Sequence, residues 1–221
     1  MERKVSRRMY EAAQEVWEAC LRHPFVQGMG DGSLPVEKFQ YFMLQDYLYL
    51  FEYARVFALG VVKARNGELM RLFARNVEEI LGGEMNIHRT YMERLGIAEE
   101  TVAKVRPALA NAAYTGYMLS VAQKGSEKEI VASILACSWS YAVIGTCLAQ
   151  IPGATDHPFY GEWIRGYAGA DYQQVNENLI GLMDSLAAGA GEEEIEYYIE
   201  IFVNCSRFEL AFWDMAWRMD E

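Results

Sequence analysis

Histidine is scarce in this chain, with 3 residues among 221: His23, His88 and His157. A carboxylate-bridged di-iron bundle requires the pattern Glu-x-x-His twice, and the sequence does not contain it. His23 and His157 each precede a proline in a loop-like context, whereas His88 follows Glu84 by four residues within a helical pattern. We therefore expect no metal and no other cofactor. A hydrogen-bonded helix residue is the favoured interpretation of His88, and a haem axial ligand is the alternative.

Cysteine is also infrequent, with four residues at Cys20, Cys137, Cys147 and Cys205. All four lie in apolar, helical-looking stretches, and no two of them form a Cys-x-x-Cys pair. This usage does not predict a disulfide framework, because small disulfide-dense domains show closely spaced cysteines. A reducing, cytoplasmic location fits it best.

Positive charge is in short supply as well. The chain has 31 acidic and 20 basic residues, for a formal net charge of −11. A field of this sign repels phosphate backbones and anionic membrane surfaces, so neither nucleic acid nor a membrane is an expected partner. The basic residues among positions 1–8 run into Glu11, Glu15 and Glu18 rather than into an apolar stretch, so we expect no secretory signal.

Several nucleotide and hydrolase motifs are missing from the sequence. We find no Gly-rich phosphate loop, no dinucleotide fingerprint and no Gly-x-Ser-x-Gly elbow. One segment, 130–155, has no formally charged residue and is long enough to span a bilayer. Because it contains several serines and threonines and is broken at Pro152-Gly153, we predict a buried central helix instead.

Apolar residues recur at intervals of three and four almost throughout, which predicts an all-α protein. We expect a single domain over residues 1–221, with loops at His23 to Pro35 and at Pro152 to Pro158. The tripeptide His-Pro-Phe occurs at 23–25 and again at 157–159, a weak indication of a two-fold-like arrangement. The expected helices span residues 2–22, 36–65, 67–95, 99–123, 127–151, 158–188 and 191–219.

Two helical stripes each place a carboxylate among apolar side chains. In the second predicted helix, Asp46 shares a face with Phe42, Tyr49 and Tyr53. An ionised carboxylate buried there needs donors from the protein or a ligand. The alternatives for Asp46 are partial exposure or pairing with an arginine from another helix.

The last predicted helix repeats the arrangement, with Glu209 on a stripe that includes Phe202, Cys205 and Phe212. Two acids on apolar faces favour recognition of a nitrogen-rich ligand or acid–base chemistry. In the uncharged helix, Cys137 precedes Tyr141 by one turn. A cysteine in such a helix is more often an inert small hydrophobe than a nucleophile.

Longer motifs carry a resemblance to a known family. They are His-Pro-Phe-Val-Gln-Gly-Met-Gly-Asp-Gly (23–32), Leu-Gln-Asp-Tyr-Leu-Tyr-Leu (44–50), Glu84-Met85 with His88, Cys-Ser-Trp-Ser-Tyr (137–141), Trp-Ile-Arg-Gly-Tyr (163–167) and Glu-Leu-Ala-Phe-Trp (209–213). In this order, over nearly the whole chain, they resemble the TenA family of thiaminase II-like aminopyrimidine hydrolases.

The resemblance implies a haem-oxygenase-like all-α fold that binds no haem and usually assembles as a homotetramer. It implies that Cys137 is the nucleophile, Glu209 the proton donor and Asp46 the group that holds the aminopyrimidine. Tyr49 matches the tyrosine that activates the thiol. The matching pocket tyrosines are Tyr114, Tyr141 and Tyr167.

The implied reaction replaces the amino or thiazolium group on the exocyclic methylene of a 4-amino-2-methylpyrimidine by hydroxyl, in thiamin salvage. The partner is thus a small molecule, either an aminopyrimidine or thiamin. Ser138 and Ser140 replace bulkier residues of the family, and Arg207-Phe208 stands where tyrosines are common, which leaves the preferred substrate open. The alternatives are a non-catalytic thiamin- or pyrimidine-binding regulator and a haem or di-iron oxygenase on the same fold.

Overall fold

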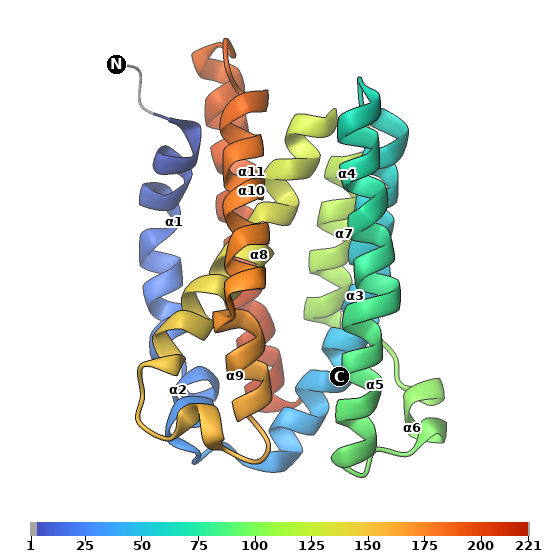
Figure 1. The fold of residues 1–221 in the computed structure, drawn as a ribbon, viewed down its shortest axis with the longest axis vertical. Coiled ribbons are helices and arrows are strands. Elements are labelled where there is room, and N and C mark those ends of the chain that lie inside the picture. Colours follow the sequence, from blue (N-terminus) through green and yellow to red (C-terminus); the bar gives the residue numbers. More distant parts are fainter. Residues whose placement is uncertain (1–3, 221) are drawn as a thin grey trace. The chain divides into compact units, whose positions relative to one another are not determined.

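The computed structural model describes residues 4–220, apart from the side chain of Glu99, and within this part the regular structure is entirely helical. The helices, labelled in Figure 1 where there is room, are α1 (Val5–Arg22), α2 (Pro24–Asp31), α3 (Val36–Lys63), α4 (Gly67–Glu78), the π-helix η1 (Glu79–Glu84), α5 (Met85–Arg94), α6 (Glu99–Lys104), α7 (Leu109–Lys124), α8 (Glu127–Ala149), the 3-10 helix η2 (Ala154–Asp156), α9 (Gly161–Ala168), α10 (Ala170–Leu186) and α11 (Glu192–Arg218). The prediction of an all-α chain is confirmed.

Three predicted helices are interrupted in the structure. The helix predicted over 99–123 is α6 followed by α7, because Pro107 lacks the amide hydrogen that a helix interior needs. The helix predicted over 158–188 divides at Gly169, whose backbone is extended with φ −65° and ψ 148°. Between α4 and α5 the chain forms the π-helix η1, which contains Gly82 and Gly83.

The first predicted loop is wrong over residues 24–31, which form α2. His23 is the residue before this helix, and its Nδ1 accepts a hydrogen bond from the Phe25 amide at 3.2 Å. Pro24 stands in the first helical turn, where its missing amide hydrogen costs nothing. The helix ends at Gly32, whose φ of 78° lies in the left-handed region that favours glycine.

The second His-Pro-Phe segment uses the same capping contact. His157 Nδ1 accepts hydrogen bonds from the amides of Phe159 at 3.2 Å and Tyr160 at 3.3 Å. The repeated tripeptide therefore corresponds to a repeated local turn that leads toward a helix. The two-fold-like arrangement stays a prediction.

The chain forms two compact units. The first contains Met1–Pro35 and Val131–Asp214, and the second contains Val36–Ile130 and Met215–Glu221. Helices α8 and α11 contribute residues to both units. The expectation of a single domain stays a prediction.

In the second unit, α3 packs against α4, α5 and α7 (Figure 1). The close approach of α3 to α4 depends on Gly60, where a Cβ atom would lie 2.7 Å from the Phe73 ring. Phe57 also packs edge-on against Phe73, at 6.2 Å between ring centroids. The loss of helix propensity at Gly60 is thus compensated by aromatic packing.

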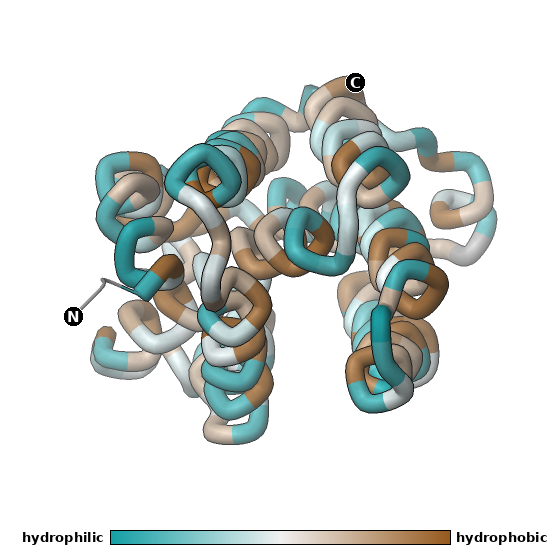
Figure 2. Tube along the Cα trace, turned by 90° about the horizontal axis from the view of Figure 1, so that it is seen from above, coloured by the Kyte–Doolittle hydropathy of each residue, from teal (hydrophilic) through white to brown (hydrophobic). Residues whose placement is uncertain are grey.

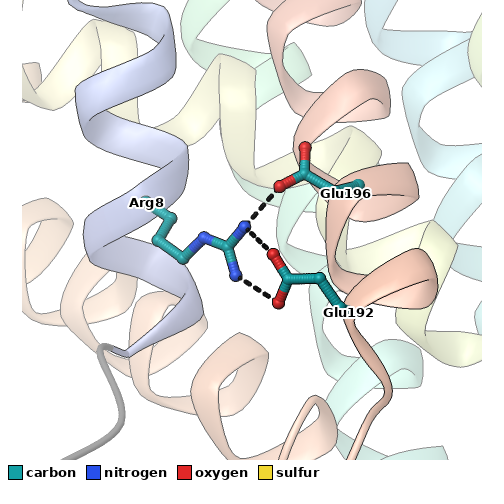
Figure 3. A network of polar contacts seen from close by, with 3 residues as sticks. All are labelled: Arg8, Glu192 and Glu196. Carbon is teal, nitrogen blue, oxygen red and sulfur yellow. Dashed lines mark hydrogen bonds and ion pairs between the residues drawn. The ribbon is translucent and has the colours of Figure 1, made fainter.

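In the first unit, α1 contacts both α10 and α11. The amide and hydroxyl of Ser6 donate to the two carboxylate oxygens of Asp184 on α10, each at 2.9 Å. Arg8 donates to both oxygens of Glu192, at 3.0 and 2.6 Å, and also contacts Glu196 (Figure 3). These contacts fix the start of α1 against the first turns of α11.

Helix α8 contains residues 130–149 of the uncharged segment that is long enough to span a bilayer. It is the one helix among residues 4–220 that is long and apolar enough to cross a membrane, yet 72% of its most apolar window is buried inside the protein. Figure 2 shows hydrophobic and hydrophilic residues interspersed along the helices. The burial of α8 agrees with the predicted buried helix, because helices that are apolar all round occur in protein cores.

Candidate active site

Asp46 is buried in α3, with 4% of its surface exposed, and so are Phe42, Tyr49 and Tyr53 on the same stripe. Its partner is a histidine: His88 Nε2 lies 2.7 Å from Asp46 Oδ2. Neither alternative considered for Asp46, partial exposure or an arginine partner, is correct. Sequence reasoning missed this pair, which joins positions 42 residues apart.

His88 is itself buried in α5, with 4% of its surface exposed. Its Nδ1 lies 3.0 Å from the backbone oxygen of Glu84, one turn earlier in the chain. Burial opposes the charged form, but the hydrogen bond and charge of Asp46, together with Glu84, outweigh burial and raise the pKa of His88. His88 is thus the hydrogen-bonded helix histidine that we predicted, with both ring nitrogens facing protein oxygens.

Tyr49 and Tyr114, both expected at the site, lie against each other. Their ring centroids are 5.3 Å apart, and they are 3% and 1% exposed, respectively. Tyr49 also stacks on Tyr53 at 5.3 Å, and its hydroxyl lies 3.8 Å from Met118 Sδ. The second unit therefore brings together two of the predicted pocket tyrosines beside Asp46 on α3.

A buried amide cluster positions α7, and hence Tyr114, relative to α3. Gln45 Nε2 donates to the Arg106 backbone oxygen at 3.0 Å, and Gln45 Oε1 accepts from the Ala108 amide at 3.0 Å. Asn111 Nδ2 donates to Gln45 at its backbone oxygen, 2.8 Å, and at Oε1, 3.1 Å. These bonds connect the start of α7 to the residue that precedes Asp46.

In the first unit, Cys137 lies on α8 and is half-buried. Its backbone oxygen accepts a hydrogen bond from Ser140 Oγ at 3.1 Å. Ser138 Oγ donates to Asn176 Oδ1 at 3.1 Å. The two serines beside Cys137 thus make polar contacts within this unit.

Tyr141, one turn after Cys137, belongs to a cluster of aromatic rings. Its ring centroid is 4.9 Å from Tyr167 and 5.6 Å from both Trp163 and Trp213. The close contact of α8 with α9 requires Gly145, because a Cβ atom there would lie 2.7 Å from the Tyr167 Cβ. Tyr141 and Tyr167, both expected at the site, therefore lie against each other, whereas Trp163 and Trp213 were not named as candidates.

Glu209 is 2% exposed on α11, in the middle of the predicted apolar stripe. The negative charge of Glu209 affects the pKa of two thiols, Cys20 and Cys205. Burial, followed by the negative charge of Glu209, raises the pKa of Cys20 to about 12 and raises the pKa of Cys205 well above its ordinary value. Both thiols are therefore protonated at neutral pH, and Cys137 is the better candidate for a nucleophile because it is half-buried.

Asp46, Tyr49 and Tyr114 belong to one unit, and Cys137, Tyr141, Tyr167 and Glu209 belong to the other. Their convergence on one pocket stays a prediction. Among the residues that the structure describes, no group of three or more histidine, cysteine, aspartate or glutamate side chains could hold a metal ion.

Known proteins are similar to this chain in both sequence and fold. An aminopyrimidine aminohydrolase of Helicobacter pylori is 48% identical over 216 residues, which is 97% of this chain and 99% of that protein. The solved TenA homologue protein from P. horikoshii OT3 is 31% identical to this chain and superposes with a TM-score of 0.90. The match covers 98% of this chain and 99% of the other.

A Shewanella denitrificans domain described as having a heme oxygenase-like fold is 15% identical and superposes with a TM-score of 0.79, covering 99% of this chain and 94% of the other. This likeness confirms the predicted haem-oxygenase-like fold. The model of the TENA/THI-4/PQQC family matches residues 10–219, almost the whole of the chain. The chain therefore belongs to the TENA/THI-4/PQQC family.

Proposed function

We propose that this protein is an aminopyrimidine aminohydrolase of thiamin salvage. The reaction replaces the amino or thiazolium group on the exocyclic methylene of a 4-amino-2-methylpyrimidine by hydroxyl, giving 4-amino-5-hydroxymethyl-2-methylpyrimidine. The observation that carries the proposal is the full-length similarity to the Helicobacter pylori aminopyrimidine aminohydrolase. The burial of Asp46 and Glu209 on two separate helices supports it, because acids in apolar surroundings are typical of catalytic sites.

In the proposed mechanism, the Cys137 thiolate adds to the ring carbon beside the one that bears the methylene, while a ring nitrogen takes up a proton. The electron pair then returns from the ring to expel the leaving group, which receives a proton from Glu209. Water adds to the resulting exocyclic alkene, and elimination of the cysteine restores the aromatic ring. The covalent adduct divides one difficult substitution into easier steps.

The other residues bind and orient the ring in this proposal. Asp46 contacts the exocyclic amino group and the adjacent ring nitrogen, a planar two-point contact. Tyr49 hydrogen-bonds the thiol, and the other tyrosines offer flat faces for a heteroaromatic ring. The proposed pocket tyrosines are Tyr114, Tyr141 and Tyr167.

A non-catalytic pyrimidine-binding regulator is the competing proposal. Such a protein needs an acid to hold the aminopyrimidine, but it has no use for a half-buried thiol one turn from a tyrosine cluster. The presence of Cys137 together with Glu209 therefore favours the enzyme.

The test is release of 4-amino-5-hydroxymethyl-2-methylpyrimidine by the purified protein from the aminomethyl compound and from thiamin, side by side. A faster rate on the aminomethyl compound would establish a salvage hydrolase, and a faster rate on thiamin would make thiamin the preferred substrate. Tight binding of the pyrimidine without release of product from either compound would contradict the proposal and favour the regulator.

We further propose that the protein acts in the cytoplasm and assembles as a homotetramer. The cysteine usage supports the location, because no cysteine is disulfide-bonded within the described residues. Exposed apolar side chains on helices of the second unit support assembly, because association would remove them from water. They are Phe51, Val62, Met70, Leu81 and Ile87.

A further inference from the structure

The two hydrogen bonds of the His88 ring determine how many protons the Asp46–His88 pair holds. His88 Nδ1 lies 3.0 Å from the Glu84 backbone oxygen, which can only accept, so Nδ1 carries a hydrogen. His88 Nε2 lies 2.7 Å from Asp46 Oδ2. A bond at that distance requires a hydrogen on Nε2 or on the carboxyl group. In either case the pair is neutral as a whole and holds one proton more than a neutral imidazole beside a carboxylate.

The surroundings favour the ionised form of the pair. The charged groups that act on His88 are Asp46 from α3 and Glu84 from η1, the two elements packed against α5. Both favour the imidazolium, and together they raise the pKa of His88 in spite of its burial. In the ionised form, His88 donates its Nε2 hydrogen to Asp46 Oδ2.

A carboxylate in this state has only part of its hydrogen-bonding capacity filled. His88 is the one donor to Asp46 among residues 4–220, and it binds Oδ2. Oδ1 and a lone pair of Oδ2 are therefore available to a ligand. An acceptor-only carboxylate matches a ligand that offers two adjacent N–H groups, as the planar fork of arginine does.

We propose that His88 is a positioning residue which keeps Asp46 ionised, so that Asp46 binds the aminopyrimidine with its ring nitrogen protonated. This inference rests on the proposed function. A neutral 4-aminopyrimidine offers one N–H donor and one bare nitrogen to Asp46, whereas the ring-protonated form offers two donors. Binding takes up one proton from solution onto the ring nitrogen, and no bond to His88 breaks. The protonated ring is electron-poor, which favours addition of a thiolate to the ring carbon beside the one that bears the methylene.

The protonation of His88 is measured by NMR on protein labelled with ¹⁵N in its histidines. The chain has only 3 histidines, so the His88 signals are assigned by their loss in His88→Gln. We expect a hydrogen on both ring nitrogens of His88 at pH 7, and a hydrogen on Nδ1 alone in Asp46→Asn. A singly protonated His88 in the unsubstituted protein would overturn the inference.

Calorimetry with 4-amino-5-hydroxymethyl-2-methylpyrimidine, in two buffers of different ionisation enthalpy, measures proton uptake on binding. We expect uptake approaching one proton at a pH where the free pyrimidine is neutral. We expect His88→Gln, which keeps a donor and loses the charge, to bind about tenfold more weakly and to take up less of a proton. Unchanged affinity and uptake in this variant would overturn the role of His88 while leaving the proposed function intact. Failure of the unsubstituted protein to bind this pyrimidine, together with failure to release it from the aminomethyl compound or thiamin, would instead overturn the proposed function.

Discussion

At the scale of single residues, the four cysteines differ in their surroundings. Cys20 and Cys205 are buried, Cys147 is exposed and Cys137 is half-buried. Burial and the charge of Glu209 raise the pKa of the two buried thiols, to about 12 for Cys20. Because the thiolate is the reactive form, neither of these residues is suited to nucleophilic attack.

Alkylation of the native protein should follow this order. With iodoacetamide at pH 8, we expect Cys147 to react readily, and Cys20 and Cys205 to stay unmodified until the protein is denatured. We expect the hydroxymethylpyrimidine to slow modification of Cys137 without affecting Cys147. Peptide mass spectrometry measures each site separately. Equal protection of Cys137 and Cys147, or fast labelling of Cys205, would contradict the assignment.

The raised pKa of His88 also predicts how stability depends on pH. Its ordinary value is 6.5, and a raised value in the folded state means that its proton stabilises the fold fully below about pH 6.5. This stabilisation is lost as the pH rises through the folded-state pKa. The Tm of the unsubstituted protein should therefore exceed that of His88→Gln by more at pH 6 than at pH 9. A difference that is constant or grows with pH would contradict the direction of the shift.

Residue patterns predicted which side chains are buried more successfully than they predicted which side chains contact each other. The helical stripes placed Asp46 and Glu209 on apolar faces, and both are buried. The partner of Asp46 is 42 residues away on another helix, and no local spacing contains that information. The aromatic contacts of Tyr141 with Trp163 and Trp213 were missed for the same reason, because they depend on how three helices pack.

At the scale of helices, the sequence predicted where helices lie better than where they break. The limits of α3 and α8 fall within two residues of the predicted ones, because both are long and strongly apolar. The break before α7 was missed although Pro107 marks it. Helix α2 was missed because its glycines and short length resemble a loop, and its cap depends on a histidine side chain rather than on the more usual serine or aspartate.

Two glycines in the second unit provide a matched test of helix packing. In Gly60→Ala on α3, the new Cβ would lie 2.7 Å from the Phe73 ring, which must shift. We expect a loss of about 1–3 kcal/mol in the free energy of unfolding. In Gly116→Ala on α7, the Cβ has no neighbour within 4 Å, and we expect a gain of about 0.5–1 kcal/mol. Urea denaturation measures both, and equal effects of the two substitutions would contradict the packing of α3 on α4.

At the scale of the whole molecule, the proposed homotetramer predicts a particular mass in solution. The chain has a mass of 25.2 kDa, and a homotetramer has four times that mass. Light scattering behind size-exclusion chromatography should give the tetramer value at micromolar concentration. The backbone amides next to the exposed apolar side chains of α3 to α5 should then exchange more slowly than in a dissociated form. A mass equal to that of one chain at all concentrations would contradict the proposal.

The charge of the whole molecule and its family membership agree about the kind of ligand. A net charge of −11 disfavours nucleic acids and other polyanions, and the proposed substrates are small nitrogen-rich rings. The central claim is that the Cys137 thiol forms a covalent intermediate with such a ring.

The most direct test is the rate of hydroxymethylpyrimidine release from the aminomethyl compound by three proteins: the unsubstituted chain, Cys137→Ala and Cys147→Ala. Cys147 lies on the same helix, α8, and is exposed, so it controls for the loss of a thiol as such. We predict that Cys147→Ala keeps close to the full rate, and that Cys137→Ala loses turnover while it still folds and binds the pyrimidine. A near-normal rate in Cys137→Ala would contradict covalent catalysis by this residue.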